Sequence, residues 1–299
     1  MMSGGYVAQQ LINGLILGSM YALVAIGFSM IYGIIRLINF AHGDVVMIGA
    51  FVTLGLAQVV GVPFPLVAVA ALATGAAMGI IIERGAFRPM RGAPQVTGFI
   101  ASLAVSIMLQ NLGILILTGQ PRNFAFPDYL QKVIRVGAVS FRVIDLCIML
   151  SALVLMCGLI FLVQKTRLGM AMRATAENLD VARLMGININ RTIMATFALG
   201  SCLAGISGLM WGGKFGQIDP LLGFVPGLKS FVAAVIGGVG SIPGAILGGY
   251  ILGLSEVLFV GLLPPIYSAY RDAFVFSTLI LILLLMPNGL LGKRMEERA

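Results

Sequence analysis

Charged residues are scarce in this sequence. Asp, Glu, Lys and Arg make up 10% of its 299 residues, whereas an average soluble domain contains roughly 25%. Hydrophobic residues account for 59% of the chain, and the mean hydropathy is +1.04. This composition excludes a water-soluble globular protein and predicts a membrane protein, in which each spanning helix needs roughly 20 residues.

Residues suited to metal binding or nucleophilic catalysis are equally few. The chain has one histidine and three cysteines. Cys147, Cys157 and Cys202 lie in apolar stretches without a CxxC spacing, so neither a disulfide nor a metal site is implied. No Ser/His/Asp set, pair of carboxylates or Walker-type phosphate loop stands at a usable spacing. We therefore expect no catalytic site, no metal site and no cofactor bound by this chain, which excludes an enzyme.

The net charge of +8 comes from 19 basic and 11 acidic residues. In a membrane protein this excess does not indicate nucleic-acid binding, because basic residues collect in cytoplasmic loops. If the loop at 165–191 is cytoplasmic, its side of the membrane holds 12 of the 19 basic residues. The sequence thus predicts a multi-pass protein of the plasma (inner) membrane with an external N-terminus and a cytoplasmic C-terminus. No basic leader or A-x-A-like cleavage site is evident, so we expect the first apolar run to be retained.

Stretches without a charged residue mark the expected spans, because a charge at mid-bilayer costs about 2.5 to 3.5 kcal/mol. Helix-breaking residues at 61–65 and near Ser241 divide two of the longer stretches. The sequence predicts an all-α polytopic transmembrane bundle of about nine spans, or eight to ten, in one domain covering residues 1–299. The expected spans are residues 9–33, 44–60, 64–82, 92–121, 146–164, 192–213, 230–241, 243–262 and 273–292.

Three polar features interrupt the apolar sequence: residues 39–44 with the only histidine, the glycine-rich break at 237–244, and Glu256 within a span. Exposed backbone and intramembrane acids are tolerated where protein or a water-filled cavity satisfies them. The candidates for a translocation pathway are Asn39, His42, Gly43, Gly237, Gly238, Gly240 and Glu256. Ordinary helix caps, a tight turn at the membrane surface and a paired structural glutamate stay open as alternatives. Other charged residues that border spans are expected to be interfacial: Asp145, Lys229, Arg271 and Asp272.

Glycines recur at four-residue spacing, at positions 14 and 18, 244 and 248, and 249 and 253. Such spacing lets helix backbones approach closely, which drives helix association in lipid. We expect these glycines to pack helices within the chain rather than between two copies.

The long loop at 165–191 contains an amphipathic segment. At 100° per residue, one face holds Ala174, Val181, Ala182 and Met185, and the opposite side holds Arg173, Glu177, Asp180 and Arg183. We expect one short helix that ends at Gly186. Leu179 and Leu184 lie outside the apolar face, so the segment either rests on the membrane surface or docks a partner.

Five stretches together resemble the membrane permease subunits of branched-chain amino-acid (LIV-type) ABC importers. They are GLILGSMYALVAIGFSMIYG (14–33), NFAHG (39–43), RATAENLDVARLMGI (173–187), LKSFVAAVIGGVGSIPGAILGG (228–249) and PNGLLG (287–292). Each stretch alone is weak, but all five in this order are specific and span nearly the whole chain.

The resemblance implies a permease working with a second, related permease, two cytoplasmic ATPase subunits that bind ATP and Mg, and an external solute-binding protein. It also implies that 173–187 enters a cleft of an ATPase subunit. The coupling residues would be Arg173, Glu177, Leu179, Asp180, Ala182, Leu184 and Gly186. Similar permeases serve urea or short amides, so the cargo stays open. An ATP-independent channel or secondary transporter is the competing class, disfavoured because paired intramembrane charges and an inverted repeat are not apparent in the sequence.

Overall fold

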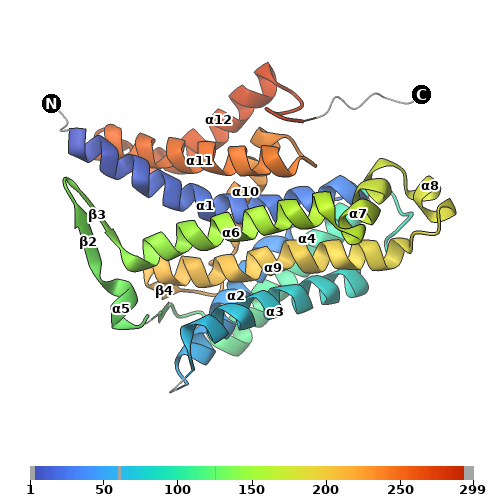
Figure 1. Ribbon diagram of the computed structural model, residues 1–299, viewed down its shortest axis with the longest axis horizontal. Helices are drawn as coiled ribbons and strands as arrows, with labels where there is room; N and C mark the ends of the chain where they lie inside the picture. Colours follow the sequence, from blue (N-terminus) through green and yellow to red (C-terminus); the bar gives the residue numbers. More distant parts are fainter. Residues whose placement is uncertain (1–3, 60–61, 125, 293–299) are drawn as a thin grey trace.

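The computed structural model describes all residues except 1–3, 60–61, 125 and 293–299. The described residues form a bundle of helices aligned with its long axis (Figure 1). Nine apolar helices make up most of it: α1 Gly4–Ile35, α2 Ala41–Ala57, α3 Phe64–Ile82, α4 Gln95–Leu117, α6 Val143–Lys165, α9 Ile189–Phe215, α10 Phe224–Gly237, α11 Ile242–Leu262 and α12 Arg271–Leu285.

Shorter elements connect these helices. They are the π-helical turn η1 Glu83–Phe87, the helices α5 Asp128–Gln131, α7 Arg167–Glu177 and α8 Leu179–Leu184, and the 3-10 helix η2 Pro265–Tyr270. Two small antiparallel sheets complete the fold: β1 Arg122–Asn123 pairs with β4 Gln217–Ile218, and β2 Val133–Val136 pairs with β3 Val139–Arg142.

Each of the nine expected apolar segments is a helix, but two of them are short. Seven helical segments among the described residues are long and apolar enough to cross a membrane, with η1 counted together with α3 and η2 together with α12. The helix α2 has 17 residues and α10 has 14, which correspond to roughly 26 and 21 Å, against a hydrocarbon core of about 30 Å. The expected nine full spans are therefore seven long helices and two shorter apolar ones.

The helices α2 and α10 are short because both begin inside the bundle. After α1 ends, Arg36 adopts a φ of 53° and the chain turns back. His42 then packs against Gly27, where a Cβ would lie 2.3 Å from its Nε2 atom. A Cβ on Gly43 would lie 2.5 Å from the carbonyl oxygen of Gly223. The N-terminal ends of α2 and α10 thus meet in the interior, at a contact that we call the half-helix junction (Gly43, Gly223 and Gly227).

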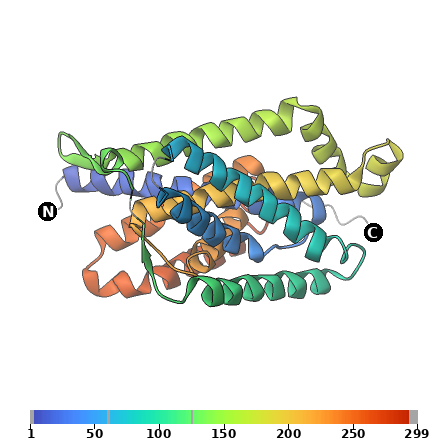
Figure 2. The same ribbon diagram turned by 90° about the horizontal axis from the view of Figure 1, so that it is seen from below.

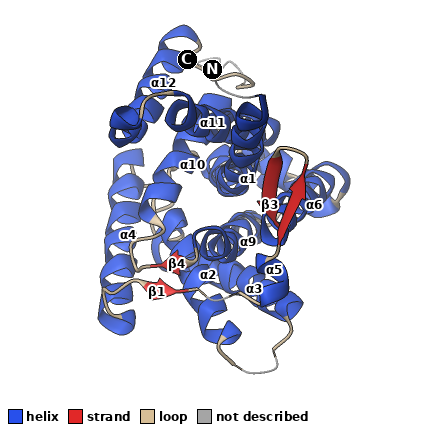
Figure 3. Ribbon diagram, turned by 90° about the vertical axis from the view of Figure 1, so that its left-hand side faces the viewer, coloured by secondary structure: helices blue, strands red, loops and turns tan. Residues whose placement is uncertain are grey.

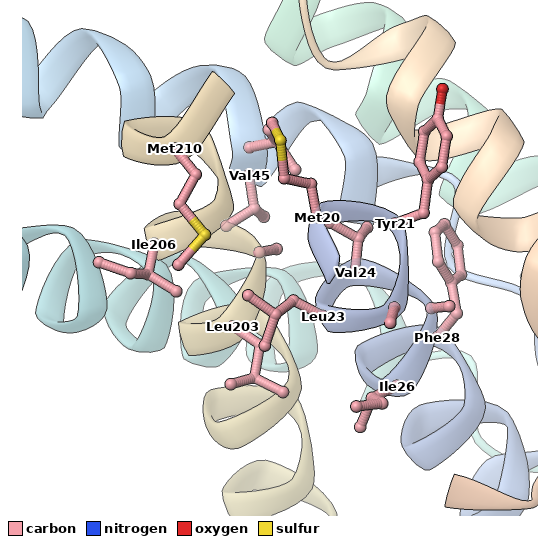
Figure 4. Packing of buried hydrophobic residues seen from close by; sticks show 14 of the residues in the cluster. Met20, Tyr21, Leu23, Val24, Ile26, Phe28, Val45, Leu203, Ile206 and Met210 are labelled. Atoms are coloured by element: carbon pink, nitrogen blue, oxygen red, sulfur yellow. The ribbon is translucent and has the colours of Figure 1, made fainter. Parts of the chain in front are cut away.

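The helices α1 and α9 form the centre of the bundle. In Figure 4, Leu23 and Val24 of α1 lie toward Val45 of α2 and Leu203 of α9, whereas Tyr21 and Phe28 lie on another side of α1. Glycines bring α1 and α11 together, because Gly18 faces Tyr250 and Gly14 faces Leu254. The prediction that the spaced glycines pack helices within the chain is confirmed.

Contacts between connecting segments define two ends of the bundle. At the end that we call the N-terminal end, the Tyr6 hydroxyl donates to the Gly261 carbonyl at 2.7 Å, and the Gln9 amide donates to the Ser140 carbonyl at 2.9 Å. At the opposite end, the Leu291 amide donates to the Gly237 carbonyl at 2.9 Å. The hairpin β2–β3 lies at the first end and the helices α7 and α8 at the second (Figures 1 and 2).

Candidate functional site

A deep cavity opens at the N-terminal end of the bundle. Its volume is about 930 Å³, and its lining comes mainly from α1, α9, α10, α11 and the start of α12. Figure 3 looks onto this end, with α1, α9 and α10 near the centre of the view and α11 and α12 above them. Along α1 the lining extends from Tyr6 to Tyr21, 15 residues apart, which corresponds to roughly 22 Å of helix. We call this cavity the vestibule.

The walls of the vestibule are mostly apolar, whereas its inner end is charged. Leu17, Trp211, Leu222, Val225 and Val257 contribute apolar wall. The inner end is lined by Lys229 of α10, Glu256 of α11 and Arg271 of α12. Together with Asp272 of α12, which pairs with Lys229 and Arg271, they form a group that we call the charge cluster. The cavity is therefore amphipathic along its depth.

The charge cluster is connected by short contacts. The Lys229 ammonium lies 2.8 Å from Glu256 Oε1 and 2.7 Å from Asp272 Oδ1. The Arg271 Nε lies 3.1 Å from the same Glu256 oxygen, and the Tyr21 hydroxyl donates to the other Glu256 oxygen at 3.0 Å. These bonds tie together α1, α10, α11 and α12.

Burial divides the charge cluster into two layers. The side chains of Lys229 and Glu256 are each 3% exposed, whereas those of Arg271 and Asp272 are 50% and 53% exposed. A buried charge is tolerated only when it is paired and hydrogen-bonded, and here two cations balance two anions. Lys229 and Glu256 are thus held inside the bundle, while Arg271 and Asp272 are half exposed.

Aromatic side chains close the bundle beyond the vestibule. Phe28 lies two helical turns after Tyr21 on α1, farther from the opening. Its ring centroid is 5.9 Å from that of Phe231, and Phe231 is 6.0 Å from Phe40, which is 5.2 Å from Phe99. We call these four rings the aromatic layer; it joins α1, α10, α4 and the segment before α2.

Three of the pathway candidates lie at the half-helix junction rather than in the vestibule. Asn39 and His42 are buried, and the His42 ring packs edge-on against Phe28 at 4.7 Å. Gly43 is in contact with the backbone of Gly223. Beside them, Asp44 accepts a hydrogen bond from Gln110 of α4 at 3.1 Å. A cavity of about 30 Å³ next to Asp44 is large enough for a water molecule.

The glycine break lies at the opposite end of the bundle. Gly238 and Gly240 have φ values of 105° and 88°, which favour glycine. Gly237 touches the backbone of Gly244, and the 288–292 segment packs against Gly238. This region is a tight turn between α10 and α11, as in one alternative from the sequence. Of the seven pathway candidates, Glu256 lines the vestibule.

The amphipathic loop differs from its expected form. It contains two helices, α7 and α8, separated by Asn178, whose side chain accepts hydrogen bonds from the Asp180 and Val181 amides. The expected single helix is wrong because this cap starts a new helix. The expected continuous face does not form, because Ala174 lies on α7 while Val181 and Ala182 lie on α8. Val181 and Met185 are 54% and 77% exposed.

The candidate coupling residues lie on the outer surface of α7 and α8 with one exception. Ala182 is buried, while the others are exposed: Arg173, Glu177, Leu179, Asp180, Leu184 and Gly186. Gly186 has a φ of 81°, consistent with the expected helix end. Arg173 donates to the Val163 carbonyl of α6, which fixes α7 against the preceding long helix.

Lys229 was expected to be interfacial, and that expectation is wrong because its side chain is buried in the charge cluster. Arg271 and Asp272 are half-exposed and belong to the same cluster. The sequence holds one signal for this arrangement. Lys229 and Glu256 are the only charged residues between Asp219 and Arg271, and two lone opposite charges in neighbouring helices favour a pair.

Comparisons with known proteins agree with this architecture. The family model described as "Branched-chain amino acid transport system / permease component" matches residues 10–284. The chain is 40% identical to the high-affinity branched-chain amino acid transport system permease protein LivH of Escherichia coli, over 98% of each chain. It is 41% identical to the corresponding protein BraD of Pseudomonas aeruginosa over 97% of each chain. A probable LivH permease of Methanocaldococcus jannaschii is 30% identical over 94% of this chain and 91% of its own. No solved structure matches the chain significantly.

Proposed function

Because this chain belongs to the family of branched-chain amino acid transport system permease components, we propose that it is a permease subunit of an ATP-driven importer of branched-chain and other hydrophobic amino acids. The vestibule is the observation that carries this proposal. Leucine, isoleucine and valine each combine a charged head with an apolar side chain. An amphipathic cavity with apolar walls and a charged inner end suits such molecules.

The N-terminal end of the bundle is the external face in this proposal. Loops at the other end carry most of the basic residues, which favours the cytoplasmic side of a plasma (inner) membrane. The vestibule then opens outward, toward an external or periplasmic solute-binding protein that delivers the amino acid. The aromatic layer closes the route to the cytoplasm in this outward-open arrangement.

Energy for transport comes from other subunits. The sequence contains no Walker-type loop, so ATP and Mg belong to two cytoplasmic ATPase subunits. A second, related permease completes the membrane part of the importer. This chain binds no cofactor of its own in that assembly and performs no chemical step.

The segment 165–191 couples ATP hydrolysis to transport in this proposal. Its helices connect directly to two long helices, α6 and α9. The Thr166 hydroxyl caps α7, and the Asn188 side chain caps α9 through the Arg191 amide at 3.1 Å. Short, capped connections make the segment a mechanical link. Closure of the ATPases on α7 and α8 would then tilt α6 and α9 and switch the vestibule between outward and inward access.

Uptake by a reconstituted importer tests the proposal. The chain would be placed in vesicles with its partner permease, ATPases and binding protein, and uptake of radiolabelled leucine and of urea would be measured with and without ATP. ATP-dependent leucine uptake is the expected result. Uptake of urea in place of leucine would support an ATP-driven importer with a different cargo. Uptake by this chain alone without ATP would overturn the proposal that it is a subunit of an ATP-driven importer.

A further inference from the structure

Among the residues that the structure describes, Lys214, Lys229 and Arg271 are the basic ones that line the vestibule, and their exposures differ. Lys214 lies 2.8 Å from Asp145 and is 21% exposed. Lys229 is 3% exposed and lies between two carboxylates, those of Glu256 and Asp272. The Arg271 side chain is 50% exposed. Arg271 is therefore the basic group of the vestibule that is most available to a molecule entering from the opening.

Arg271 also has donors to spare. Its Nε lies 3.1 Å from Glu256, which orients the side chain from one edge. A guanidinium has five N–H donors in a planar fork, and the fork matches the two oxygens of a carboxylate. The buried carboxylate of Glu256 thus holds one edge of a guanidinium that lines the cavity and is half exposed.

The surroundings of Arg271 fit the remaining parts of an amino acid. The apolar wall formed by residues such as Trp211, Val225 and Val257 suits a branched aliphatic side chain. Asp219 also lines the vestibule, and its carboxylate offers an acceptor for an ammonium group. The charge cluster is neutral by itself, so a zwitterion that binds beside it adds no net charge there.

We propose that Arg271 binds the α-carboxylate of the amino acid in the vestibule, held in place by the buried pair Lys229–Glu256. This inference rests on the proposed function, and it assigns the specificity-determining contact of that site. Arg271 selects molecules that have a carboxylate, while the apolar wall selects the side chain. Urea and short amides lack the carboxylate and gain nothing from this residue.

A cycle that combines variants with ligand analogues tests the inference. The purified complex, without binding protein, would be assayed for equilibrium binding of radiolabelled leucine and of leucinamide, in which a neutral amide replaces the carboxylate. Arg271→Gln should weaken leucine binding roughly tenfold to a hundredfold, the range for a charge-assisted hydrogen bond. It should not weaken binding of leucinamide, which is a cation and gains nothing from Arg271. Arg271→Lys should recover part of the leucine affinity, because it restores the charge but not the fork.

Controls separate this role from a structural one. Arg122→Gln removes a basic residue at the same end of the bundle but outside the vestibule lining, and it should leave both affinities unchanged. An equal loss of leucine and leucinamide binding in Arg271→Gln would overturn the inference, since it would indicate a general disturbance of the site. Unchanged leucine affinity in Arg271→Gln would also overturn it, while leaving the proposed function intact if the wild-type complex still transports leucine. Failure of the wild-type complex to transport leucine would overturn the proposed function itself.

Discussion

The strongest test of the site's energetics is to remove the buried pair one partner at a time. In Glu256→Gln, Lys229 loses the carboxylate at 2.8 Å and keeps Asp272 at 2.7 Å. In Lys229→Met, Glu256 keeps Arg271 at 3.1 Å and the Tyr21 hydroxyl at 3.0 Å. Each single change leaves a nearly buried charge with fewer partners, so both variants should be destabilised.

The magnitude follows from the contacts that remain. Removing one partner of a buried ion pair costs about 3 to 5 kcal/mol when the other is left alone. Because each survivor here keeps a second partner, we expect roughly 2 to 3 kcal/mol for each single variant. In the double variant Lys229→Met/Glu256→Gln, Arg271 and Asp272 remain, half-exposed and 3.7 Å apart. The double variant should cost no more than a single one, which gives a coupling energy of at least about 2 kcal/mol.

The assay is denaturation of the purified chain in mixed micelles, with the free energy of unfolding measured for all four proteins of the cycle. The pair Lys214–Asp145 provides a matched control, because its contact is also 2.8 Å but its side chains are 21% and 6% exposed. Its coupling energy should be smaller, since solvent screens a more exposed pair. Strictly additive losses for Lys229 and Glu256 would falsify the reasoning that the two charges depend on each other.

Three further predictions concern other parts of the chain. Gly43→Ala should lower the yield of folded protein in detergent, because its Cβ would lie 2.5 Å from a backbone oxygen. Gly55→Ala on the same helix has open space around the new Cβ and should leave the yield unchanged. Equal yields of the two variants would contradict the close packing at the half-helix junction. Phe28→Ala should open the aromatic layer and allow leucine efflux from loaded vesicles without ATP. If the variant's vesicles retained leucine as well as wild-type vesicles do, the aromatic layer would not be the barrier. Leu184→Asp on α8, where the side chain is 86% exposed, should reduce ATP-driven uptake without changing thermal stability. Val136→Asp on the hairpin β2–β3, where the side chain is 62% exposed, should leave uptake unchanged. Equal uptake by both variants would show that α8 does not belong to the coupling segment.

Much of the fold is predictable from the sequence because insertion into a membrane depends on local composition. Uncharged runs correspond to all nine apolar helices, and the glycine spacing correctly predicts packing of α1 against α11. The lengths of α2 and α10 were harder to predict from the sequence. Their starting points depend on contacts such as Gly43 with Gly223, which are distant in the sequence. A composition pattern locates an apolar segment but not its depth in the bundle.

Prediction was weaker for the candidate site. Glu256 stands out because an acid in a span is costly, and the structure places it at the inner end of the vestibule. Lys229 and Arg271 sit near the ends of apolar runs, where interfacial exposure is the ordinary outcome for a long basic side chain. Similarly, helical periodicity continued through Asn178 and predicted one helix, although a side-chain cap divides the segment.

The sequence by itself determined that this is a helical membrane protein of the branched-chain amino acid permease family, because hydropathy and short motifs are properties of neighbouring residues. Tertiary structure alone decided that α2 and α10 meet end to end, and that Lys229 lies between carboxylates 27 and 43 positions farther along the chain. It also formed the vestibule, whose lining comes from five helices. Charges that must leave water find partners wherever the folded chain brings them close, and sequence separation does not limit that choice.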